Sequence, residues 1–391
     1  MTNQLDNAGT GANAYAAAGV DTAAGDRAVD LMRAAVSRTM TPDVLGGVGG
    51  FAGLVDVSAL KDYRRPLLAT STDGVGTKIA IAQALDIHHT IGRDLVGMVV
   101  DDIVVVGARP LLMTDYIACG RVVPERIADI VRGIAEGCEE VGVPLLGGET
   151  AEHPGLMAPD EYDVAGAATG VVEADRVLGA DRVQAGDVLI AMASSGLHSN
   201  GYSLVRKIVA DSGWALERVV PEFGRTLGEE LLEPTRLYTR PCLDMATTTS
   251  LHALSHVTGG GLAANLARVI PAGLTARVDR GSVAVPAVFQ VFAALGKISW
   301  EDLEDTLNLG VGMVAVVAPD AVDEVIAVST RAGIPAWVLG DVVAGEGAEV
   351  LNAEGAGGTV VKQSSVATRV ITGTKGVRAG AVRISGNYRL G

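Results

Sequence analysis

The sequence predicts an α/β (α+β) fold in which mixed sheets are flanked by helices and the chain is divided into two domains. The chain has 391 residues, which is long for a single core. Its hydrophobic fraction of 48% is sufficient for two cores. Strand-like and helix-like segments alternate along most of the sequence, as in α/β proteins. Together these observations favour two α/β domains.

The first half contains most of the elements that we expect in an N-terminal domain at residues 21–178. Residues 1–20 are rich in Ala, Asn and Gly and predict a flexible lead-in. Apolar positions at helical spacing then predict a helix at residues 28–38. Further along, we expect helices at residues 91–106 and 125–141, and strands at residues 66–70, 111–118, 143–146 and 164–172.

A polar, turn-rich segment at residues 175–186 separates the two halves, so we place the domain boundary near residue 178. The C-terminal α/β domain is expected at residues 179–352. Its helices are predicted at residues 201–211, 261–269 and 320–332, and its strands at residues 187–193, 274–278, 311–317 and 336–339.

The composition changes again at residues 353–391. This segment is rich in glycine, and six basic side chains face a single acidic residue, Glu354; the basic residues are Lys362, Arg369, Lys375, Arg378, Arg383 and Arg389. We predict a basic, disordered extension here. An arm that binds anions is the alternative.

Charge and cysteine usage limit the classes of partner. The net charge of −15 repels a nucleic acid at long range, although magnesium and backbone amides can still hold a small phosphate ligand. The three cysteines lack metal-ligand or pairing patterns, which is typical of a reducing compartment. No apolar run reaches the ~20 residues of a membrane span, and the first residues lack a signal pattern. We therefore expect a cytoplasmic protein with no nucleic-acid or membrane partner.

The motif TDGVGTK at residues 72–78 is the most informative stretch of the sequence. Asp73 follows a strand-like run, two glycines allow backbone amides to approach a ligand, and Lys78 comes shortly after. This combination is suited to a magnesium-bound polyphosphate. A simple turn after a strand is the alternative.

Four further carboxylates point to the same chemistry. Asp94 and Asp101 are seven residues apart on the apolar predicted helix, with Asp102 beside them, and buried carboxylates need a partner or a metal. Pairing with Arg93 or Arg109 is the alternative. Glu149 follows another strand-like run and two glycines. Separate carboxylates with glycine neighbours favour a two-magnesium triphosphate site.

Two loops of the second half can offer amide donors to phosphate. The motif SSGLHSNGYS at residues 194–203 lies between a strand and a helix, and HVTGGG at residues 256–261 opens another helix. A helix capped by Ser199 or Asn200 explains the first loop nearly as well. The glycines at residues 46–54 predict a mobile flap. This segment lacks the ending of a P-loop and the context of a dinucleotide fingerprint, which excludes both of those assignments.

Taken in order, these motifs resemble the phosphoribosylformylglycinamidine cyclo-ligases, also called aminoimidazole ribonucleotide synthetases. The resemblance covers residues 15–343 and rests on YAAAGVD, GGVGGF, STDGVGTK, HHTIGRDLV, GARPLLMTDY, GIAEGC, GGETAEHPG, YDVAG, SSGLHSNGYSL, PTRLY, HVTGGG and GVGM. It implies a two-domain ATP-binding synthetase architecture whose N-terminal domains pair in a homodimer. It also implies ATP-dependent ring closure of formylglycinamidine ribonucleotide to 5-aminoimidazole ribonucleotide, with release of ADP and phosphate, in de novo purine biosynthesis.

The resemblance also implies roles for individual residues. ATP and phosphate would contact Gly49, Gly50, Asp73, Gly74, Gly76, Thr77 and Lys78. Mg²⁺ would be held by Asp73, Asp102 and Glu149. Substrate would contact His89, Thr90, Asp94, Ser199, Asn200, Thr258, Gly259 and Gly260. Lys78, His198 and His256 are the catalytic candidates, and the histidines suit either phosphate binding or proton transfer.

The sequence departs from the family pattern in two places. An Asn-Asp pair is usual on the acidic helix, but Asp101 and Asp102 stand here, which adds a charge beside the expected metal. Ser37 and Arg38 stand where lysines commonly precede the first glycine loop. Another phosphoryl-transfer enzyme of the same superfamily is the main alternative function, and a nucleotide-binding regulatory protein is a third.

Overall fold

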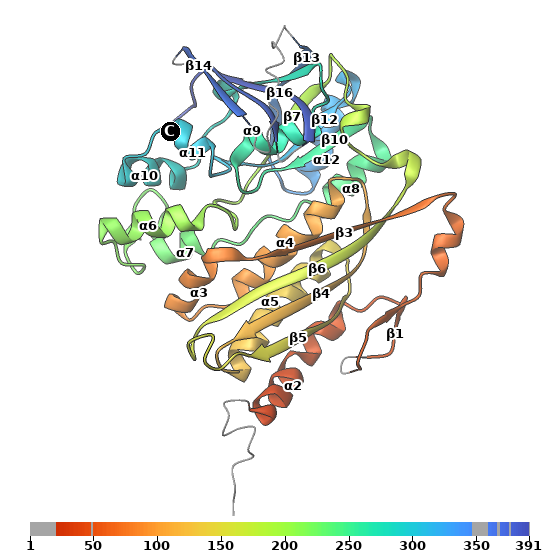
Figure 1. The fold of residues 1–391 in the computed structure, drawn as a ribbon, viewed down its shortest axis with the longest axis vertical. Helices are drawn as coiled ribbons and strands as arrows, with labels where there is room; N and C mark the ends of the chain where they lie inside the picture. The colour runs from red at the N-terminus through yellow and green to blue at the C-terminus, as the bar shows by residue number, and fades with distance from the viewer. Residues whose placement is uncertain (1–20, 48–49, 346–358, 366–367, 375–376, 391) are drawn as a thin grey trace, which may run out of the picture.

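The computed structural model describes residues 21–47, 50–345, 359–365, 368–374 and 377–390. Two layered α/β units are stacked along the long axis of the molecule (Figure 1). The lower one holds a four-stranded sheet and the upper one an eight-stranded sheet. The predicted fold class is therefore confirmed. The predicted flexible lead-in at residues 1–20 lies outside the described residues.

The lower unit is built on a sheet with the order β3-β6-β4-β5. Its strands are β3 (Pro66–Gly74), β4 (Arg109–Cys119), β5 (Leu145–Glu152) and β6 (Tyr162–Glu173). Only β4 and β5 run parallel. One face of the sheet is covered by α2 (Thr22–Arg38), α4 (His89–Val104) and α5 (Pro124–Val141) (Figure 1).

Glycines set how closely α4 and α5 pack. A Cβ atom on Gly133 would overlap the backbone of His89, and one on Gly92 would overlap the backbone around Ile130. The two helices therefore touch backbone to backbone. This close packing holds α4, which carries the three aspartates, firmly against the helical side of the sheet.

No helix of the described residues covers the opposite face of this sheet (Figure 1). Leu68 on β3 is 66% exposed and Tyr116 on β4 is 42% exposed. Small residues such as Ala167 lie between them on β6. The described residues thus leave one face of the sheet uncovered.

The upper unit holds a mixed sheet with the order β10-β12-β7-β13-β11-β16-β15-β14. Its strands are β7 (Val188–Ala193), β10 (Leu251–His256), β11 (Leu274–Asp279), β12 (Val311–Val317), β13 (Ala336–Ala344), β14 (Thr359–Ser365), β15 (Thr368–Thr374) and β16 (Val377–Ser385). Every residue of β12 is buried. Its main helices are α6 (Tyr202–Ser212), α8 (Thr239–Thr248), α9 (Gly261–Leu266), α10 (Ala287–Gly296) and α12 (Val322–Arg331).

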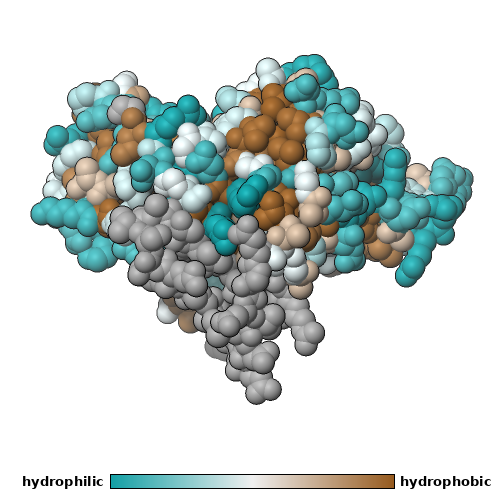
Figure 2. Space-filling model, turned by 90° about the horizontal axis from the view of Figure 1, so that it is seen from above, coloured by the Kyte–Doolittle hydropathy of each residue, from teal (hydrophilic) through white to brown (hydrophobic). Residues whose placement is uncertain are grey.

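Shorter elements connect these layers. They are β1 (Val44–Leu45), β2 (Leu54–Val55), β8 (Val219–Val220), β9 (Arg225–Thr226), α3 (Ile79–Leu85), α7 (Leu227–Leu231) and α11 (Trp300–Glu304). Hydrophilic side chains cover much of the upper surface, where an apolar cluster is also exposed (Figure 2). Among the described helices, none has the length and apolar character to cross a membrane.

The prediction of a disordered C-terminal extension was wrong for the described part of residues 353–391. Strands β14, β15 and β16 extend the upper sheet, and β16 pairs in parallel with β11, from Thr275 opposite Ala381 to Asp279 opposite Ser385. Val382 and Ile384 are buried in the core. The prediction rested on the basic, glycine-rich composition of the segment. Its β-branched residues, which favour strands, indicate the observed structure.

Two strands run further than the sequence predicted. β3 includes Asp73 and Gly74, beyond the strand predicted at residues 66–70. β5 includes Gly147, Gly148 and Glu149, beyond the strand predicted at residues 143–146. Glycine weakens a strand but does not end it when a neighbouring strand supplies the hydrogen bonds. Asp73 and Glu149 are therefore fixed by the sheet rather than by flexible turns.

Candidate active site

The TDGVGTK turn of the lower unit lies directly against the SSGLHSNG loop of the upper unit. The Ser199 hydroxyl donates to the carbonyl of Val75 at 2.7 Å, and the hydroxyls of Thr77 and Ser203 are 3.2 Å apart. Gly76 has a φ of +72°, a conformation that side chains rarely adopt. The structure thus brings two motifs together that are more than a hundred residues apart in the sequence.

Asp73 is the penultimate residue of β3 and lies in this contact region. Its carboxylate accepts a hydrogen bond at 2.8 Å from the amide of Gly74. Thr77 and Gly76 are exposed beside it. Asp73 also contributes its negative charge to the surroundings of His256, which comes from the upper unit. The end of β3 therefore faces the boundary between the two sheets.

Lys78 lies in a different environment from the one we predicted. Its ammonium nitrogen lies 2.7 and 2.9 Å from the two carboxylate oxygens of Asp94. It also donates to the carbonyls of His198 at 3.0 Å and Glu233 at 2.7 Å, and its side chain is fully buried. All three donor positions of an ammonium group are used. This position does not support the predicted contact between Lys78 and a ligand phosphate.

Asp94 belongs to the same network, so its predicted contact with substrate is likewise unsupported. Besides Lys78, it accepts hydrogen bonds from the amide and the hydroxyl of Thr235, at 2.8 and 2.6 Å. Its side chain is fully buried. Lys78 and Asp94 belong to the lower unit, whereas Thr235 and Glu233 follow α7 in the upper unit. The pair therefore ties the two units together.

Asp101 and Asp102 face different partners although they are adjacent on α4. Asp101 is buried and accepts from the Tyr238 amide at 3.0 Å and the Thr239 hydroxyl at 2.7 Å, at the start of α8. Burial raises the pKa of Asp101 to about 6. The additional carboxylate of this sequence is thus a structural link to α8. Neither aspartate pairs with Arg93, which binds Glu140 instead.

Asp102 pairs with His256, the last residue of β10. Its carboxylate lies 2.9 Å from Nδ1 of His256, whose side chain is only 3% exposed. Burial acts to lower the pKa of His256, but the hydrogen bond to Asp102 and the charges of Asp101 and Asp73 outweigh it and raise the pKa. The neighbouring carboxylates therefore favour the positively charged form of His256.

His198 has the opposite character. Burial lowers the pKa of His198 well below its usual value, and the charges of His256 and Lys78 act in the same direction. His198 also has a φ of +63°, which is uncommon for a residue other than glycine and is frequent at functional sites. The Ser195 amide donates to its Nε2 at 3.1 Å, which stabilises the neutral ring with its proton on Nδ1.

One ring nitrogen of each histidine has no partner among the described residues. These buried atoms are Nδ1 of His198 and Nε2 of His256. Nε2 of His198 accepts, so Nδ1 carries the proton of its neutral ring. Nδ1 of His256 donates to Asp102, and Nε2 also carries a proton in the charged form that the neighbouring carboxylates favour. Gly312 of β12 lies beside the His198 ring, which a Cβ atom at this position would overlap, and its carbonyl accepts from the amide of Val257, the residue after His256. Two buried N–H donors of this kind suit an anionic oxygen.

The HVTGGG loop closes the site on the side of the upper unit. The amide of Gly259 donates to the side chain of Asn200 at 3.0 Å, which joins this loop to the SSGLHSNG loop. Gly259 and Gly260 are exposed, and Gly260 has a φ of +96°. The side chain of Asn265 donates to the carbonyls of Thr258 and Gly261 and thereby holds the loop from behind.

Several predicted site residues lie elsewhere. His89 begins α4, and at 1.5 Å per residue it lies about 20 Å along the helix from Asp102. The buried hydroxyl of Thr90, at the same end, has no partner among the described residues. Gly50 is exposed in the glycine-rich segment between β1 and β2. Gly49 lies outside the described residues.

Glu149 lies apart from Asp73 in the four-stranded sheet. Asp73 stands opposite Gly166, Gly166 opposite Asp115, and Asp115 opposite Gly148, the neighbour of Glu149. Three strand spacings separate Asp73 from this position, which amounts to about 14 Å. No group of three metal-binding side chains occurs among the residues that the structure describes. The predicted triad of Asp73, Asp102 and Glu149 therefore stays a prediction, and the strand order sets Glu149 apart from Asp73 within one chain.

Residue-based reasoning missed Tyr238 and Thr235. Tyr238 is fully buried beside His198, and its hydroxyl donates to the carbonyl of Ala193 at 2.8 Å. Both residues belong to the motif PTRLY, which entered only through the family resemblance. A threonine and a tyrosine close together in a proline-led stretch are the signal that could have indicated buried hydrogen bonds.

Sequence comparison places these features in a known context. Residues 55–172 match the family described as AIR synthase related protein, N-terminal domain, and residues 184–351 match its C-terminal domain. A phosphoribosylformylglycinamidine cyclo-ligase from Geobacillus sp. (strain WCH70) is 49% identical over 337 residues, which cover 86% of this chain and 97% of that protein. The protein of the same name from Thermosynechococcus vestitus is 48% identical over 338 residues, covering 86% and 98%.

Solved structures share the fold at lower identity. Thiamine-monophosphate kinase from Stenotrophomonas maltophilia has a TM-score of 0.59 at 19% identity and covers 82% of this chain and 94% of its own. Hydrogenase maturation protein HypE in complex with ATP has a TM-score of 0.57 at 17% identity, with coverages of 86% and 88%. These likenesses show that the two-layered architecture is shared.

Proposed function

The chain belongs to the AIR synthase related protein family, and on that premise we propose that it is a phosphoribosylformylglycinamidine cyclo-ligase of purine biosynthesis. It closes the ring of formylglycinamidine ribonucleotide with ATP and releases 5-aminoimidazole ribonucleotide, ADP and phosphate. The observation that carries the proposal is the meeting of TDGVGTK with SSGLHSNG and HVTGGG beside two buried N–H donors. HypE, a protein of the same fold, was crystallised with ATP, which supports ATP as the co-substrate.

The reaction needs an anion-binding site at its centre. The formyl oxygen is a poor leaving group, so it first takes the γ-phosphoryl group of ATP, and ADP leaves. The amidine nitrogen then attacks the formyl carbon, loses a proton, and phosphate leaves. In both steps negative charge on phosphoryl oxygens must be stabilised.

The two histidines are proposed to supply this stabilisation. Nδ1 of His198 and Nε2 of His256 donate to phosphoryl oxygens, because each is buried, protonated and without a partner among the described residues. Asp102 holds His256 in its charged form and fixes its orientation. This arrangement favours phosphate binding over a general-base role for His198, whose Nε2 already accepts a hydrogen bond from Ser195.

Other residues are proposed to orient the two substrates. Gly74, Gly76 and Thr77 offer backbone and hydroxyl groups to the ATP phosphates at the end of β3. Asn200 and the exposed loop of Thr258, Gly259 and Gly260 contact formylglycinamidine ribonucleotide. Lys78 and Ser199 act indirectly, because both are bonded to groups across the domain contact.

Mg²⁺ is proposed as the partner of ATP. Asp73 and Asp102 are suited to hold it, because both carboxylates contribute charge around His256 and magnesium is often bound by one or two carboxylates together with phosphate oxygens. When bound, the ion neutralises charge on the phosphate chain. Asp102 is 36% exposed, so it is open to a further ligand.

Turnover by the purified full chain tests the function. With ATP, Mg²⁺ and formylglycinamidine ribonucleotide, we expect ADP and 5-aminoimidazole ribonucleotide to form in equal amounts, and only background ADP release when that ribonucleotide is omitted. Thiamine monophosphate serves as the competing acceptor. Its phosphorylation, without turnover of the ribonucleotide, would assign the chain to another branch of phosphoryl-transfer enzymes.

The uncovered face of the four-stranded sheet is proposed to pair with a second copy of the chain, giving a homodimer. Leu68 and Tyr116 are apolar and exposed there, and small residues between them allow close approach of another sheet. The purified chain should therefore have twice the mass of the 39.9 kDa monomer.

Ala167→Lys tests this interface. Ala167 lies in the central strand β6, opposite Thr72 on one side and Thr114 on the other, so a lysine would place a charge in the middle of the proposed contact. Light scattering should give a monomer for this variant at micromolar concentration. Ala210→Lys, on the exposed side of α6, is the control and should leave the mass unchanged. A dimer for Ala167→Lys would refute this interface.

The proposal places the enzyme in the cytoplasm. The sequence predicts a reducing compartment from its cysteine usage. In the structure Cys119, Cys138 and Cys242 are all buried and free, and burial raises the pKa of Cys119 to about 11. Such thiols are unreactive near neutral pH.

A further inference from the structure

The end of the C-terminal extension is folded onto the upper unit behind the site. After β16 the chain turns at Gly386, which has a φ of +81°. Arg389 then pairs with the segment that follows β11: its amide donates to the carbonyl of Val283 and its carbonyl accepts from the amide of Val285, both at 3.1 Å. The Arg389 side chain also donates to the carbonyl of Ser282 at 2.8 Å. Several independent contacts therefore fix the residues around Tyr388.

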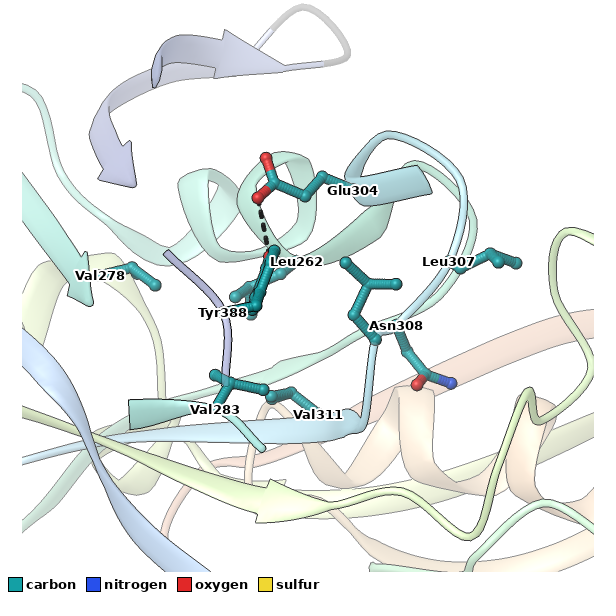
Figure 3. A pocket seen from close by; sticks show the side chains of 9 residues that line it. Leu262, Val278, Val283, Glu304, Leu307, Asn308, Val311 and Tyr388 are labelled. Atoms are coloured by element: carbon teal, nitrogen blue, oxygen red, sulfur yellow. Dashed lines mark hydrogen bonds between the residues drawn. The ribbon is translucent and has the colours of Figure 1, made fainter. Parts of the chain in front are cut away.

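Tyr388 completes a buried polar cluster with Glu304 and Arg280. Figure 3 shows its bond to Glu304. Its hydroxyl donates to Oε1 of Glu304 at 2.7 Å. Arg280 binds both carboxylate oxygens of Glu304, with Nη2 at 2.9 Å from Oε2, and donates to the carbonyl of Gly386 at 3.3 Å. Burial and the charge of Glu304 raise the pKa of Tyr388, so the hydroxyl keeps its proton.

The ring of Tyr388 fills the space between α9, α11 and β12. It lies 5.8 Å from the ring of Trp300 in α11. Only a cavity of about 10 Å³, the size of one water molecule, remains beside it; the lining includes Leu262, Leu307 and Asn308 (Figure 3). The extension thus contributes a side chain to the packing directly behind the loops of the site.

Glu304 begins a connecting segment, residues 304–310, that touches both loops. The carbonyl of Glu304 occupies the place that a Cβ atom on Gly261 would need, so α9 begins directly on this segment. The side chain of Leu307 occupies the place that a Cβ atom on Gly201 would need. Asn308 accepts from the Ser194 hydroxyl at 3.0 Å and donates to the carbonyl of Gly196 at 2.9 Å.

We propose that Tyr388 is a positioning residue, through which the C-terminal extension holds residues 304–310 and thereby sets the HVTGGG loop for the ribonucleotide substrate. The family match ends at residue 351, so Tyr388 lies in the part of the chain beyond the match. The substrate assignment rests on the proposed function. The mechanical coupling rests only on the contacts of Tyr388, Glu304 and Gly261.

Tyr388→Phe is the main test, because it keeps the ring and removes the bond to Glu304. Loss of a hydrogen bond to a buried charge, transmitted to one loop, should raise the KM for formylglycinamidine ribonucleotide by about fivefold. The KM for ATP and kcat should stay within about twofold. Tyr388→Ala, which also opens a cavity, should raise the same KM further. Leu390→Ala, an exposed change in the same segment, is the control.

Hydrogen exchange gives a readout that does not depend on turnover. Amides of residues 256–266 should exchange at least about threefold faster in Tyr388→Phe than in the parent chain, while those of α12 remain unchanged. Unchanged exchange in the loop together with an unchanged KM would overturn the coupling. Equal losses of kcat and stability without a selective effect on KM would also overturn it. A parent chain without turnover contradicts the proposed function, whereas the exchange result still decides the coupling.

Discussion

Asp73→Asn is expected to lower ATP turnover by about 100- to 1,000-fold while the protein remains folded. Asp73 lies at the end of β3, where its charge acts on His256 and where the ATP phosphates are proposed to bind. Asparagine keeps the size of the side chain and can still accept from the Gly74 amide, but it cannot supply the negative charge. Steady-state ADP release at saturating ATP measures the loss, and circular dichroism checks the fold.

Asp163→Asn is the matched control for this variant. Asp163 also lies in the four-stranded sheet, and its carboxylate accepts from the next amide, that of Val164, at 2.9 Å. It is exposed, however. Turnover should stay within about twofold of the parent in the control. Normal turnover of Asp73→Asn would show that the site has been assigned to the wrong end of β3.

Lys78→Met is expected to lower the free energy of unfolding by about 3–5 kcal/mol. Lys78 and Asp94 are both fully buried, and the substitution leaves the Asp94 carboxylate without its cation. It also leaves the carbonyls of His198 and Glu233 without their donor. Urea unfolding followed by fluorescence measures the change, and the transition should separate into two steps if the ties between the units are weakened.

A second substitution distinguishes the buried charge from simple loss of packing. Adding Asp94→Asn to Lys78→Met removes the uncompensated charge, while the amide oxygen can still accept from Thr235, so the double variant should recover about 1–2 kcal/mol. Lys207→Met breaks an exposed Lys–Asp pair with Asp211 and should cost less than about 1 kcal/mol. A loss this small for Lys78→Met would mean that the buried pair does not tie the units together.

The glycine-rich and polar motifs could be located from the sequence because their chemistry is local. A strand followed by Asp and Gly, or a loop of Ser, His, Asn and Gly before a helix, offers the same polar groups to a ligand in any fold that contains it. The loops that hold Asp73, His198, Ser199, Asn200 and residues 258–260 were identified on this basis, and the family resemblance assigned the roles of their residues. The structure brings these loops together. Their catalytic roles stay predictions.

Other residues could not be assigned in this way, because their partners come from distant parts of the chain. Asp101 and Asp102 are neighbours in the sequence, yet helical rotation turns one toward α8 and the other toward β10. Lys78 has the sequence context of a phosphate ligand, but carbonyls from the upper unit enclose it. Glu149 repeats the pattern of Asp73, and only the order of strands shows that they are far apart.

By itself, the sequence determined the α/β class, the positions of most strands and helices, and the motifs that indicate phosphate chemistry, since these depend on residues close together in the chain. The tertiary structure alone decided which carboxylates share a site, that Lys78 ties two units together, and that the extension adds strands instead of remaining disordered. These outcomes depend on strand order, burial and packing between distant segments. Patterns of neighbouring residues do not specify such contacts.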